Sequence, residues 1–259
     1  MTQLKKYLID MVVTKVDHLG DNYVSLWLKP TEGSMPEMRP GQFVELKAPA
    51  SSGALLRRPI SVNDIDGDSM RLLIRRAGKV TSEFLNVVPG DIVNTLLPLG
   101  NGWSIDKAGD KPLLIGGGVG VAPLLYLGRK LNESGIEPTF LLGARTADDL
   151  LELDDFTKCG SVLTTTEDGS HGEKGFVTNH RKLLHGSWSQ IYCCGPEPMM
   201  KAVGAVAHRL NIPCEVSLEN TMACGLGACL CCVQSTIEGH RCVCTDGPVF
   251  NIDQLLWQD

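Results

Sequence analysis

A cysteine-rich stretch near the C-terminus reads Glu219-Asn220-Thr221-Met222-Ala223-Cys224-Gly225-Leu226-Gly227-Ala228-Cys229-Leu230-Cys231-Cys232 and resumes as Cys242-Val243-Cys244-Thr245-Asp246-Gly247-Pro248. Cys224, Cys229 and Cys232 follow the order C-x4-C-x2-C, which is the ligand spacing of a plant-type [2Fe–2S] loop. Such a loop must aim backbone N–H groups at sulfur, and Gly225 and Gly227 permit backbone conformations that a Cβ resists. We therefore predict an iron–sulfur cluster in this stretch.

Two other uses of these cysteines fit less well. A zinc site prefers two C-x2-C pairs, and the stretch offers only one half of that pattern, at Cys229 and Cys232. A disulfide framework needs an oxidising compartment, and nothing in residues 1–6 suggests export. The fourth cluster ligand is Cys242 or Cys244. We favour Cys244, because a turn signal that could fold it back over the loop follows at Asp246-Gly247-Pro248.

The composition limits the classes of function. A chain of 259 residues with 43% hydrophobic residues is long enough for two domains with real cores and an appended module. Aromatic residues make up only 5% and the net charge is −6, which argues against binding to nucleic acid. No apolar run reaches the length of a membrane span. We expect a cytoplasmic protein with no nucleic-acid or membrane partner, whose ten cysteines serve metal or redox chemistry.

The N-terminal part predicts a small antiparallel β-barrel. Apolar or alternating segments rich in β-branched residues are separated by glycine and proline turns, at residues 7–16, 23–29, 43–47, 70–75 and 91–97. Two spots in this barrel suit a nucleotide. In the first, Arg57-Arg58-Pro59-Ile60-Ser61, arginine can pair with a diphosphate and serine with the edge of a heteroaromatic ring. In the second, Gly78, Thr81 and Ser82 precede a short helical pattern that would aim N–H groups at an anion. The alternative is two solvated arginines and an ordinary helix cap.

The central part alternates strands and helices, which predicts a parallel sheet with ligands at the carboxyl ends of its strands. Strands are expected at 111–115, 139–142, 162–165 and 190–193, and helices at 124–131 and 200–209. The turn after the first strand reads Gly116-Gly117-Gly118-Val119-Gly120-Val121-Ala122-Pro123. A glycine turn between strand and helix places a pyrophosphate over helix N–H groups. The glycines depart from the strict G-x-G-x-x-G fingerprint, so a purely structural turn is the alternative.

Three further positions at strand ends suit a nicotinamide nucleotide. Cys194 follows the strand at 190–193 and is either a small buried residue or a sulfur beside the nicotinamide ring. Glu167 and Asp168 follow another strand, where an adenosine ribose is bound, and acidic groups there disfavour the 2′-phosphate of NADPH. Arg145 follows a third strand and weakens this preference for NADH.

With these motifs in this order, the chain resembles the ferredoxin–NADP reductase superfamily. Within it, the chain is similar to the electron-transfer subunits of type B dihydroorotate dehydrogenase over nearly its whole length. The resemblance implies an FAD-binding antiparallel β-barrel at residues 1–102 and a parallel α/β nicotinamide-binding domain at residues 103–211. It implies a small [2Fe–2S] domain at residues 212–259.

The resemblance also implies the site residues. The flavin motif of the family corresponds to Arg58, Pro59, Ile60 and Ser61. Two further FAD contacts correspond to Leu73, Ile74 and Arg75 and to Val80 and Thr81, although the family has glycine where this chain has Val80. The nicotinamide motifs correspond to Gly116, Gly117, Gly118, Val119, Gly120, Cys194, Gly195 and Pro196. The cluster ligands correspond to Cys224, Cys229, Cys232 and Cys244.

The family implies a redox relay. NAD(H) exchanges a hydride with N5 of FAD, with Cys194 positioning the nicotinamide and Ser61 near N5, and single electrons pass between FAD and the [2Fe–2S] cluster. The implied partner is an FMN-containing catalytic subunit that oxidises dihydroorotate in pyrimidine biosynthesis, in a heterotetramer of two copies of each chain, with NAD⁺ as the final acceptor. An alternative is the same role in a ferredoxin:NAD(P) oxidoreductase, sulfide dehydrogenase or hydrogenase. A third hypothesis is a non-enzymatic metal-binding or redox-sensing module.

Overall fold

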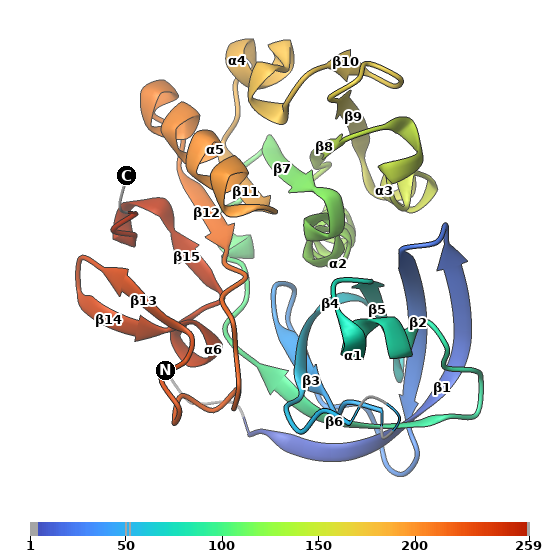
Figure 1. The fold of residues 1–259 in the computed structure, drawn as a ribbon. Coiled ribbons are helices and arrows are strands. Elements are labelled where there is room, and N and C mark those ends of the chain that lie inside the picture. The colour runs from blue at the N-terminus through green and yellow to red at the C-terminus, as the bar shows by residue number, and fades with distance from the viewer. Residues whose placement is uncertain (1–4, 50, 52, 258–259) are drawn as a thin grey trace.

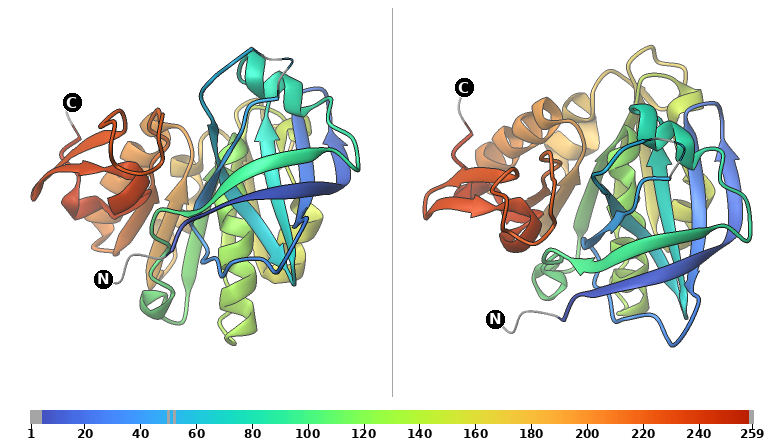
Figure 2. Two further views of the ribbon diagram at one scale, coloured as in Figure 1. Left: turned by 90° about the horizontal axis from the view of Figure 1, so that it is seen from below. Right: turned by 60° about the horizontal axis from the view of Figure 1, so that its bottom comes forward.

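The structure, a computed structural model, describes residues 5–49, 51 and 53–257 (Figure 1). An antiparallel barrel comes first along the chain, a layered α/β part follows, and a small module of short strands and loops comes last. The views in Figure 2 place the small C-terminal module beside the barrel, next to strands β12 and β15. The predicted fold class is therefore confirmed.

The described part of the barrel is closed by six strands in the order β1-β2-β5-β4-β3-β6, and all neighbouring pairs are antiparallel. The strands are β1 (Tyr7–Leu19), β2 (Tyr23–Pro30), β3 (Phe43–Leu46), β4 (Arg58–Asp66), β5 (Ser69–Arg75) and β6 (Ile92–Leu99). Helix α1 (Lys79–Phe84) follows β5 and buries Val80 and Phe84 in the barrel core. The core forms because aliphatic side chains at alternate positions of the strands turn inward, as Val24, Leu26 and Leu28 do on β2.

Strand β4 carries the sequence Arg58-Pro59-Ile60-Ser61 and was expected as a motif rather than as a strand. Its proline and its many polar residues weaken the strand signal. It forms because β3 and β5 pair with both of its edges, with Phe43 opposite Ser61 and Leu72 opposite Val62. The flavin motif of the sequence therefore lies inside the barrel sheet rather than in a loop.

Among the described residues, the α/β part is built on a seven-stranded sheet of order β10-β9-β8-β7-β11-β12-β15, in which only β15 is antiparallel to its neighbour. The strands are β7 (Pro112–Gly117), β8 (Thr139–Ala144), β9 (Ser161–Thr166), β10 (Glu173–Lys174), β11 (Gln190–Cys194), β12 (Cys214–Ser217) and β15 (Val249–Asn251). The helices are α2 (Ala122–Glu133), α3 (Leu153–Cys159), α4 (Arg181–His185) and α5 (Glu197–Leu210).

The two longest helices cover opposite faces of this sheet. Leu124 of α2 packs with Phe140 and Tyr192 in one core, and Val203 of α5 packs with Ile115 in the other. Alternating side chains of the central strands thus serve both cores, because successive residues of a strand point to opposite faces. Short 3₁₀ turns complete the connections at Ile105–Lys107, Gly118–Val121, Ala147–Asp149, Val177–Asn179 and Ile252–Gln254.

The C-terminal module contains the hairpin of β13 (Val233–Thr236) and β14 (Gly239–Cys242) and the short helix α6 (Val243–Asp246). Strands β12 and β15 precede and follow it and belong to the large sheet, and Cys232 and Cys244 pack into the same core as that sheet. The domain boundaries after residues 102 and 211 stay predictions, because the sheet continues beyond residue 211.

None of the helices in the described ranges is long and apolar enough to cross a bilayer. The expectation of a cytoplasmic protein also drew on the first six residues, and residues 1–4 lie outside the described part of the chain. The localisation therefore stays a prediction.

Candidate cofactor sites

The loop before β13 curls tightly with no helix or strand. Gly225 and Gly227 have φ angles of 62° and 78°, and Leu230 has a φ angle of 58°, a left-handed conformation that side chains with a Cβ rarely adopt. A Cβ on Gly225 would come within 2.9 Å of the Glu45 carboxyl carbon, and one on Gly227 within 3.1 Å of Thr245. The glycines predicted to shape this loop therefore do so, by conformation and by close approach.

Backbone N–H groups of this region point at cysteine sulfur atoms. The N–H of Leu226 donates to Cys224 Sγ at 3.4 Å, that of Gly227 donates to Cys244 Sγ at 3.2 Å, and that of Cys244 donates to Cys232 Sγ at 3.4 Å. For Cys224, burial raises the pKa, but hydrogen bonds from the backbone of Leu226 and Cys229 outweigh it and lower the pKa to about 7. Such donors favour the thiolate, which is the form that binds iron.

The four predicted ligands stand in two pairs. The thiols of Cys224 and Cys229 are hydrogen-bond neighbours, and so are those of Cys232 and Cys244. Within the described ranges, no three His, Cys, Asp or Glu side chains converge as the ligands of one metal ion would. Two cysteine pairs fit a two-iron cluster, in which each iron takes two protein ligands.

The two remaining cysteines of the module lie differently. Cys231 is exposed. Cys242 Sγ is itself the donor in a 3.9 Å contact with the carbonyl of Gly227. The buried Cys244, by contrast, accepts a backbone N–H. This difference supports the prediction that Cys244 is the fourth ligand.

Asn101, just after the barrel, ties the cluster module to the rest of the chain. Its side-chain amide donates to the carbonyls of Asp246 and Val249 at 2.9 and 3.0 Å and accepts the N–H of Val249 at 3.1 Å. Its own N–H donates to the carbonyl of Gly247 at 2.6 Å. The turn Asp246-Gly247-Pro248, expected to fold Cys244 over the loop, is therefore held by a residue far away in sequence.

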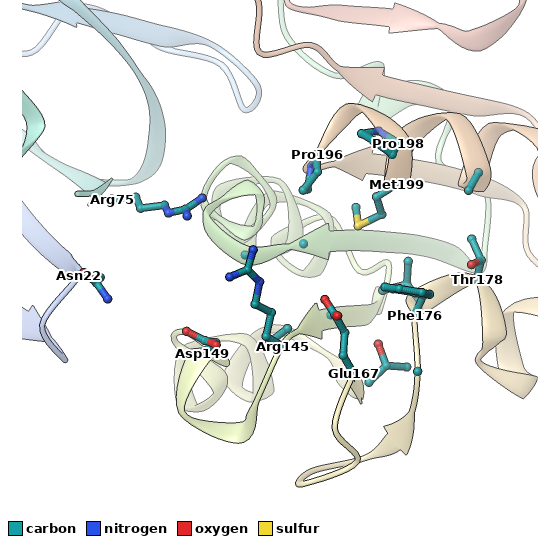
Figure 3. A pocket seen from close by; sticks show the side chains of 18 of the residues that line it. Asn22, Arg75, Arg145, Asp149, Glu167, Phe176, Thr178, Pro196, Pro198 and Met199 are labelled. Carbon is teal, nitrogen blue, oxygen red and sulfur yellow. The ribbon is translucent and has the colours of Figure 1, made fainter. Parts of the chain in front are cut away.

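A cavity of about 590 Å³ opens where the barrel meets the α/β part (Figure 3). The barrel side contributes Asn22, Tyr23, Arg75 and Arg76. The other side consists of strand ends and the turns that follow them, with Gly117, Gly118, Gly143, Ala144, Arg145, Asp149, Thr165, Glu167, Gly175, Phe176, Val177, Thr178, Pro196, Pro198, Met199 and Ala202. It is the position expected for a nucleotide, at the carboxyl ends of parallel strands.

The glycine turn after β7 is shaped by the neighbouring strand. A Cβ on Gly117 would lie 2.5 Å from Met199 Sδ, and one on Gly120 would lie 2.6 Å from both the Cys194 carbonyl oxygen and Gly195 Cα. Gly118, in contrast, has a φ angle of 55° and open space in front of it. The turn therefore packs against the β11–α5 turn, and its cavity-facing residues among the predicted set are Gly117 and Gly118. Gly116, Val119 and Gly120 lie behind them.

Cys194 is buried at the end of β11, 1% exposed, and does not line the cavity, whereas Pro196 does. Its sulfur lies 3.9 Å from Glu219 Oε1. Burial raises the pKa of the Cys194 thiol well above its ordinary value, so this thiol is neutral near pH 7. Glu219 is exposed overall, but protein surrounds its carboxyl group. This burial raises the pKa of the carboxyl group, and the positive charge of Arg75 opposes the shift.

The predicted flavin residues divide by what their side chains can reach. Arg75 lines the cavity, and Ser61 is half-buried on β4. Leu73, Ile74 and Val80 are buried in the hydrophobic cores, and so any contact with a cofactor is limited to their backbone.

The remaining predicted flavin residues organise their own loops. Arg58 Nη1 donates to the carbonyls of Leu56 and Arg57 at 2.9 and 3.1 Å. Thr81 Oγ1 accepts the N–H groups of Ala77 and Gly78 at 2.8 and 3.0 Å. Pro59 and Ile60 follow Arg58 on β4 and are half-buried. Each spot is therefore a loop held by its own hydrogen bonds, with Arg58 half-buried in the first and Gly78 exposed in the second.

The acidic residues expected near a ribose are not equivalent. Glu167 lines the cavity beside Arg145, as Figure 3 shows. Asp168 does not line it. Its carboxylate accepts the N–H and hydroxyl of Ser170 at 2.9 and 2.7 Å, and these hydrogen bonds lower its pKa. Of these two residues, Glu167 is therefore the one that a bound nucleotide would meet.

Several cavity residues carry no sequence signal. Phe176 is 62% exposed at the rim, and Thr165 places a buried hydroxyl without a hydrogen-bond partner on the cavity wall. An exposed aromatic ring fits a ligand that contains an aromatic ring. Thr165 could be found from the sequence only because it ends a predicted parallel strand. No pattern in the sequence around Phe176 indicates that it lines a cavity.

Comparison with known proteins agrees with this geometry. Residues 219–256 match the family described as iron–sulfur cluster binding domain of dihydroorotate dehydrogenase B, and residues 114–205 match the oxidoreductase NAD-binding domain. The electron-transfer subunit of dihydroorotate dehydrogenase B (NAD(+)) from Bacillus caldolyticus is 39% identical over 229 residues, covering 85% of this chain and 88% of its own length. The chain belongs to the family of dihydroorotate dehydrogenase B electron-transfer subunits. Its counterpart from Listeria monocytogenes is 39% identical over 253 residues and covers 95% and 98% of the two chains.

A solved structure of an NADH-dependent reduced ferredoxin–NADP oxidoreductase, studied for flavin-based electron bifurcation, has the same fold. Its TM-score is 0.85 at 31% identity, over 95% of this chain and 90% of that one. Membership of the electron-transfer subunit family confirms the predicted class, an oxidoreductase subunit of the ferredoxin–NADP reductase superfamily. The predicted cofactors, FAD, a [2Fe–2S] cluster and NAD(H), are confirmed with it.

Proposed function

We propose that this chain relays electrons between a catalytic partner subunit and NAD⁺ as the electron-transfer subunit of an NAD-dependent dihydroorotate dehydrogenase. One observation carries the proposal: a single barrel contacts both sites. Arg75 lines the nucleotide cavity, and Glu45 and Leu99 contact the cluster loop at Gly225. When bound, FAD exchanges a hydride with NAD(H) and single electrons with a [2Fe–2S] cluster. A barrel between the two sites is what such an exchange requires.

At the nucleotide cavity, the residues of this chain bind and orient. Gly117 and Gly118 leave room for the backbone to approach a pyrophosphate, and Arg75 supplies positive charge. Glu167 accepts hydrogen bonds from ribose hydroxyls and repels a 2′-phosphate. Cys194 is buried outside the cavity lining and neutral, so it acts on the nicotinamide only through the backbone turn it forms with Gly195 and Pro196. Ser61 donates or accepts a hydrogen bond at the flavin ring edge.

Arg58, Pro59, Ile60 and Ser61, with the backbone of Leu73, Ile74, Val80 and Thr81, hold FAD on the barrel. At the cluster, Cys224, Cys229, Cys232 and Cys244 provide the four thiolates. N–H donors such as those of Leu226 and Gly227 offset their negative charge.

The proposed partner is an FMN-containing chain that oxidises dihydroorotate in pyrimidine biosynthesis, in a heterotetramer of two copies of each subunit. Family membership supports it, because the relatives are named as electron-transfer subunits of that dehydrogenase. The dihydroorotate site lies on the partner. In this chain no group serves as a general acid or base, and hydride transfer needs none.

The test is an assay of the native assembly. The chain is isolated with its partners from its source cells, and dihydroorotate-dependent reduction of NAD⁺ is measured before and after this chain is removed. Loss of activity on removal supports the proposal. Retained bleaching of the flavin by NADH without any orotate formation contradicts it, and would favour the role of the oxidoreductase with the matching fold.

A further inference from the structure

A buried polar cluster joins the barrel to the α/β part, between the flavin motif on β4 and the start of α2. It consists of Asn63 on β4, Arg71 on β5 and Glu152 before α3, and none of the three lines the cavity. Asn63 is 0% exposed, and the side chains of Arg71 and Glu152 are 12% and 1% exposed. Charged groups this deeply buried are costly unless paired, so their presence calls for a reason.

Asn63 links the two motifs that the reaction must bring together. It lies two residues beyond Ser61 on the same strand, at a β-bulge between Val62 and Asp64 that interrupts the regular pairing with β5. Its side-chain amide donates to the carbonyl of Ala122 at 3.1 Å, and Ala122 is the first residue of α2, directly after the glycine turn. The flavin strand and the nucleotide turn are therefore joined through one side chain.

Glu152 completes the link from the other side. Its Oε2 accepts a second hydrogen bond from the Asn63 amide at 2.9 Å, and its Oε1 lies 2.8 Å from Arg71 Nη2, in an ion pair outside hydrogen-bond angles. Arg71 also reaches Asp155 at 2.7 Å and Ser25 at 2.8 Å.

The backbone at Glu152 is unusual as well. It has a φ angle of 56°, a left-handed conformation that costs energy in a residue with a Cβ. Burial raises the pKa of its carboxyl group, and the positive charge of Arg71 opposes that shift. A strained backbone and a buried charge are both maintained so that this carboxylate reaches across the interface.

We propose that the cluster of Asn63, Arg71 and Glu152 is a positioning device that fixes the distance and angle between the flavin strand and the nucleotide turn. This inference rests on the proposed hydride transfer between NAD(H) and FAD. An apolar contact of the same size would hold the two parts together, but it would resist sliding less than directed hydrogen bonds do. Hydride transfer is sensitive to small displacements of the reacting groups, so the rate should depend on this cluster.

The experiment separates positioning from stability in the full chain loaded with FAD. Arg71→Met leaves the buried Glu152 carboxylate without its cation, and Glu152→Met leaves Arg71 paired with Asp155 alone. Each variant should lower the melting temperature. The double variant Arg71→Met/Glu152→Met removes both charges and should recover most of that loss.

We expect its flavin reduction by NADH in stopped flow to stay at least about tenfold slower than in the parent chain, with an unchanged dissociation constant for NADH. Glu152→Gln, which keeps an oxygen for the Asn63 amide, should recover part of the rate.

The matched control is Lys158→Met, which removes the solvent-side partner of Asp155 at 2.8 Å. It should change neither the rate nor the affinity. A double variant that regains both melting temperature and reduction rate would show that the cluster only stabilises, and would overturn the inference. Failure of the hydride transfer on which the inference rests looks different, because NADH would then not bleach the flavin of the unmodified chain. Failure of the proposed dihydroorotate role would leave that bleaching intact. Calorimetry of the apo chain adds a readout without turnover: the double variant should unfold in two transitions where the parent unfolds in one.

Discussion

The cluster loop and the nucleotide cavity are built in opposite ways. The loop takes its proposed ligands from residues 224–244, and its sulfur atoms accept N–H groups from the same short stretch. The cavity takes its lining from the barrel and from the ends of four strands spread over residues 22–202. A local site is specified by spacing, whereas a dispersed site is specified by how separate elements pack.

This difference has a consequence for substitutions. In the loop, a substitution matters if it removes a cluster ligand, or if the new residue cannot adopt the φ angle that the backbone requires there. In the cavity, residues that touch no ligand, such as Gly120, matter because they set how closely two turns approach.

The largest effect should follow from replacing the fourth ligand. In Cys244→Ser the sulfur that accepts the Gly227 N–H is lost, and the isolated chain should lack the visible absorption of a [2Fe–2S] cluster. Cys242→Ser is the matched control, because that sulfur accepts no backbone N–H, and it should keep the spectrum. The opposite pattern would assign the ligand to Cys242.

A smaller effect should follow from crowding the glycine turn. In Gly120→Ala the new Cβ meets the backbone of Cys194 and Gly195 at 2.6 Å, which neither can avoid without moving the turn. Overpacking of this kind costs about 1–3 kcal/mol, so binding of NADH should weaken by roughly tenfold. Titration with NADH in the absence of turnover measures this.

Gly128→Ala is the control for that change. Its Cβ would lie 2.2 Å from Phe140 Cζ in the core behind α2, far from the cavity lining. It should lower the melting temperature and leave the affinity for NADH as it was. Equal losses of affinity in both variants would mean that the turn has no special role.

A third prediction concerns the choice between NADH and NADPH. Glu167→Gln removes the negative charge that a 2′-phosphate would meet beside Arg145. The ratio of kcat/KM for NADPH to that for NADH should rise by roughly fivefold, the size of a partly screened charge interaction of about 1 kcal/mol. Asp168→Asn should leave the ratio unchanged, since Ser170 already holds that carboxylate. A larger response to Asp168→Asn would refute this assignment.

The smallest effect is a pH dependence of stability at His180, which caps the N-terminus of α4. His180 Nδ1 accepts the N–H of Lys182 at 3.1 Å, so the folded state requires neutral imidazole at this atom. Burial lowers the pKa of His180 below its ordinary 6.5, and Glu173 opposes that shift. The unfolded chain therefore binds more protons, and the free energy of unfolding should fall as the pH drops below 6.5 toward the folded pKa.

His180→Asn keeps an acceptor at the helix N-terminus and removes this titration. The change in melting temperature between pH 7.5 and pH 5.5 should therefore be smaller in the variant than in the parent. An unchanged difference would locate the acid sensitivity elsewhere.

Much of the site was accessible from the sequence, but unevenly. The spacing of Cys224, Cys229 and Cys232 predicted the cluster, because ligands from one loop must follow the geometry of the group they bind. The run from Gly116 to Gly120 predicted the nucleotide turn, although Gly120 proved to serve packing rather than access. Strand β4 was missed as a strand, because pairing with β3 and β5 supplies what its own pattern lacks.

Sequence by itself determined the order of the parts, the cluster motif and the family, since these depend on spacing and composition along the chain. Only the folded structure shows that Glu167 rather than Asp168 lines the cavity, and that Phe176 and Thr165 line it as well. The same holds for Asn101, which holds the cluster turn. It also decided the contact of Asn63 with Ala122 and Glu152. The physical reason is that these contacts join residues far apart in sequence, and only the packing of barrel, sheet and loop brings them within hydrogen-bond distance.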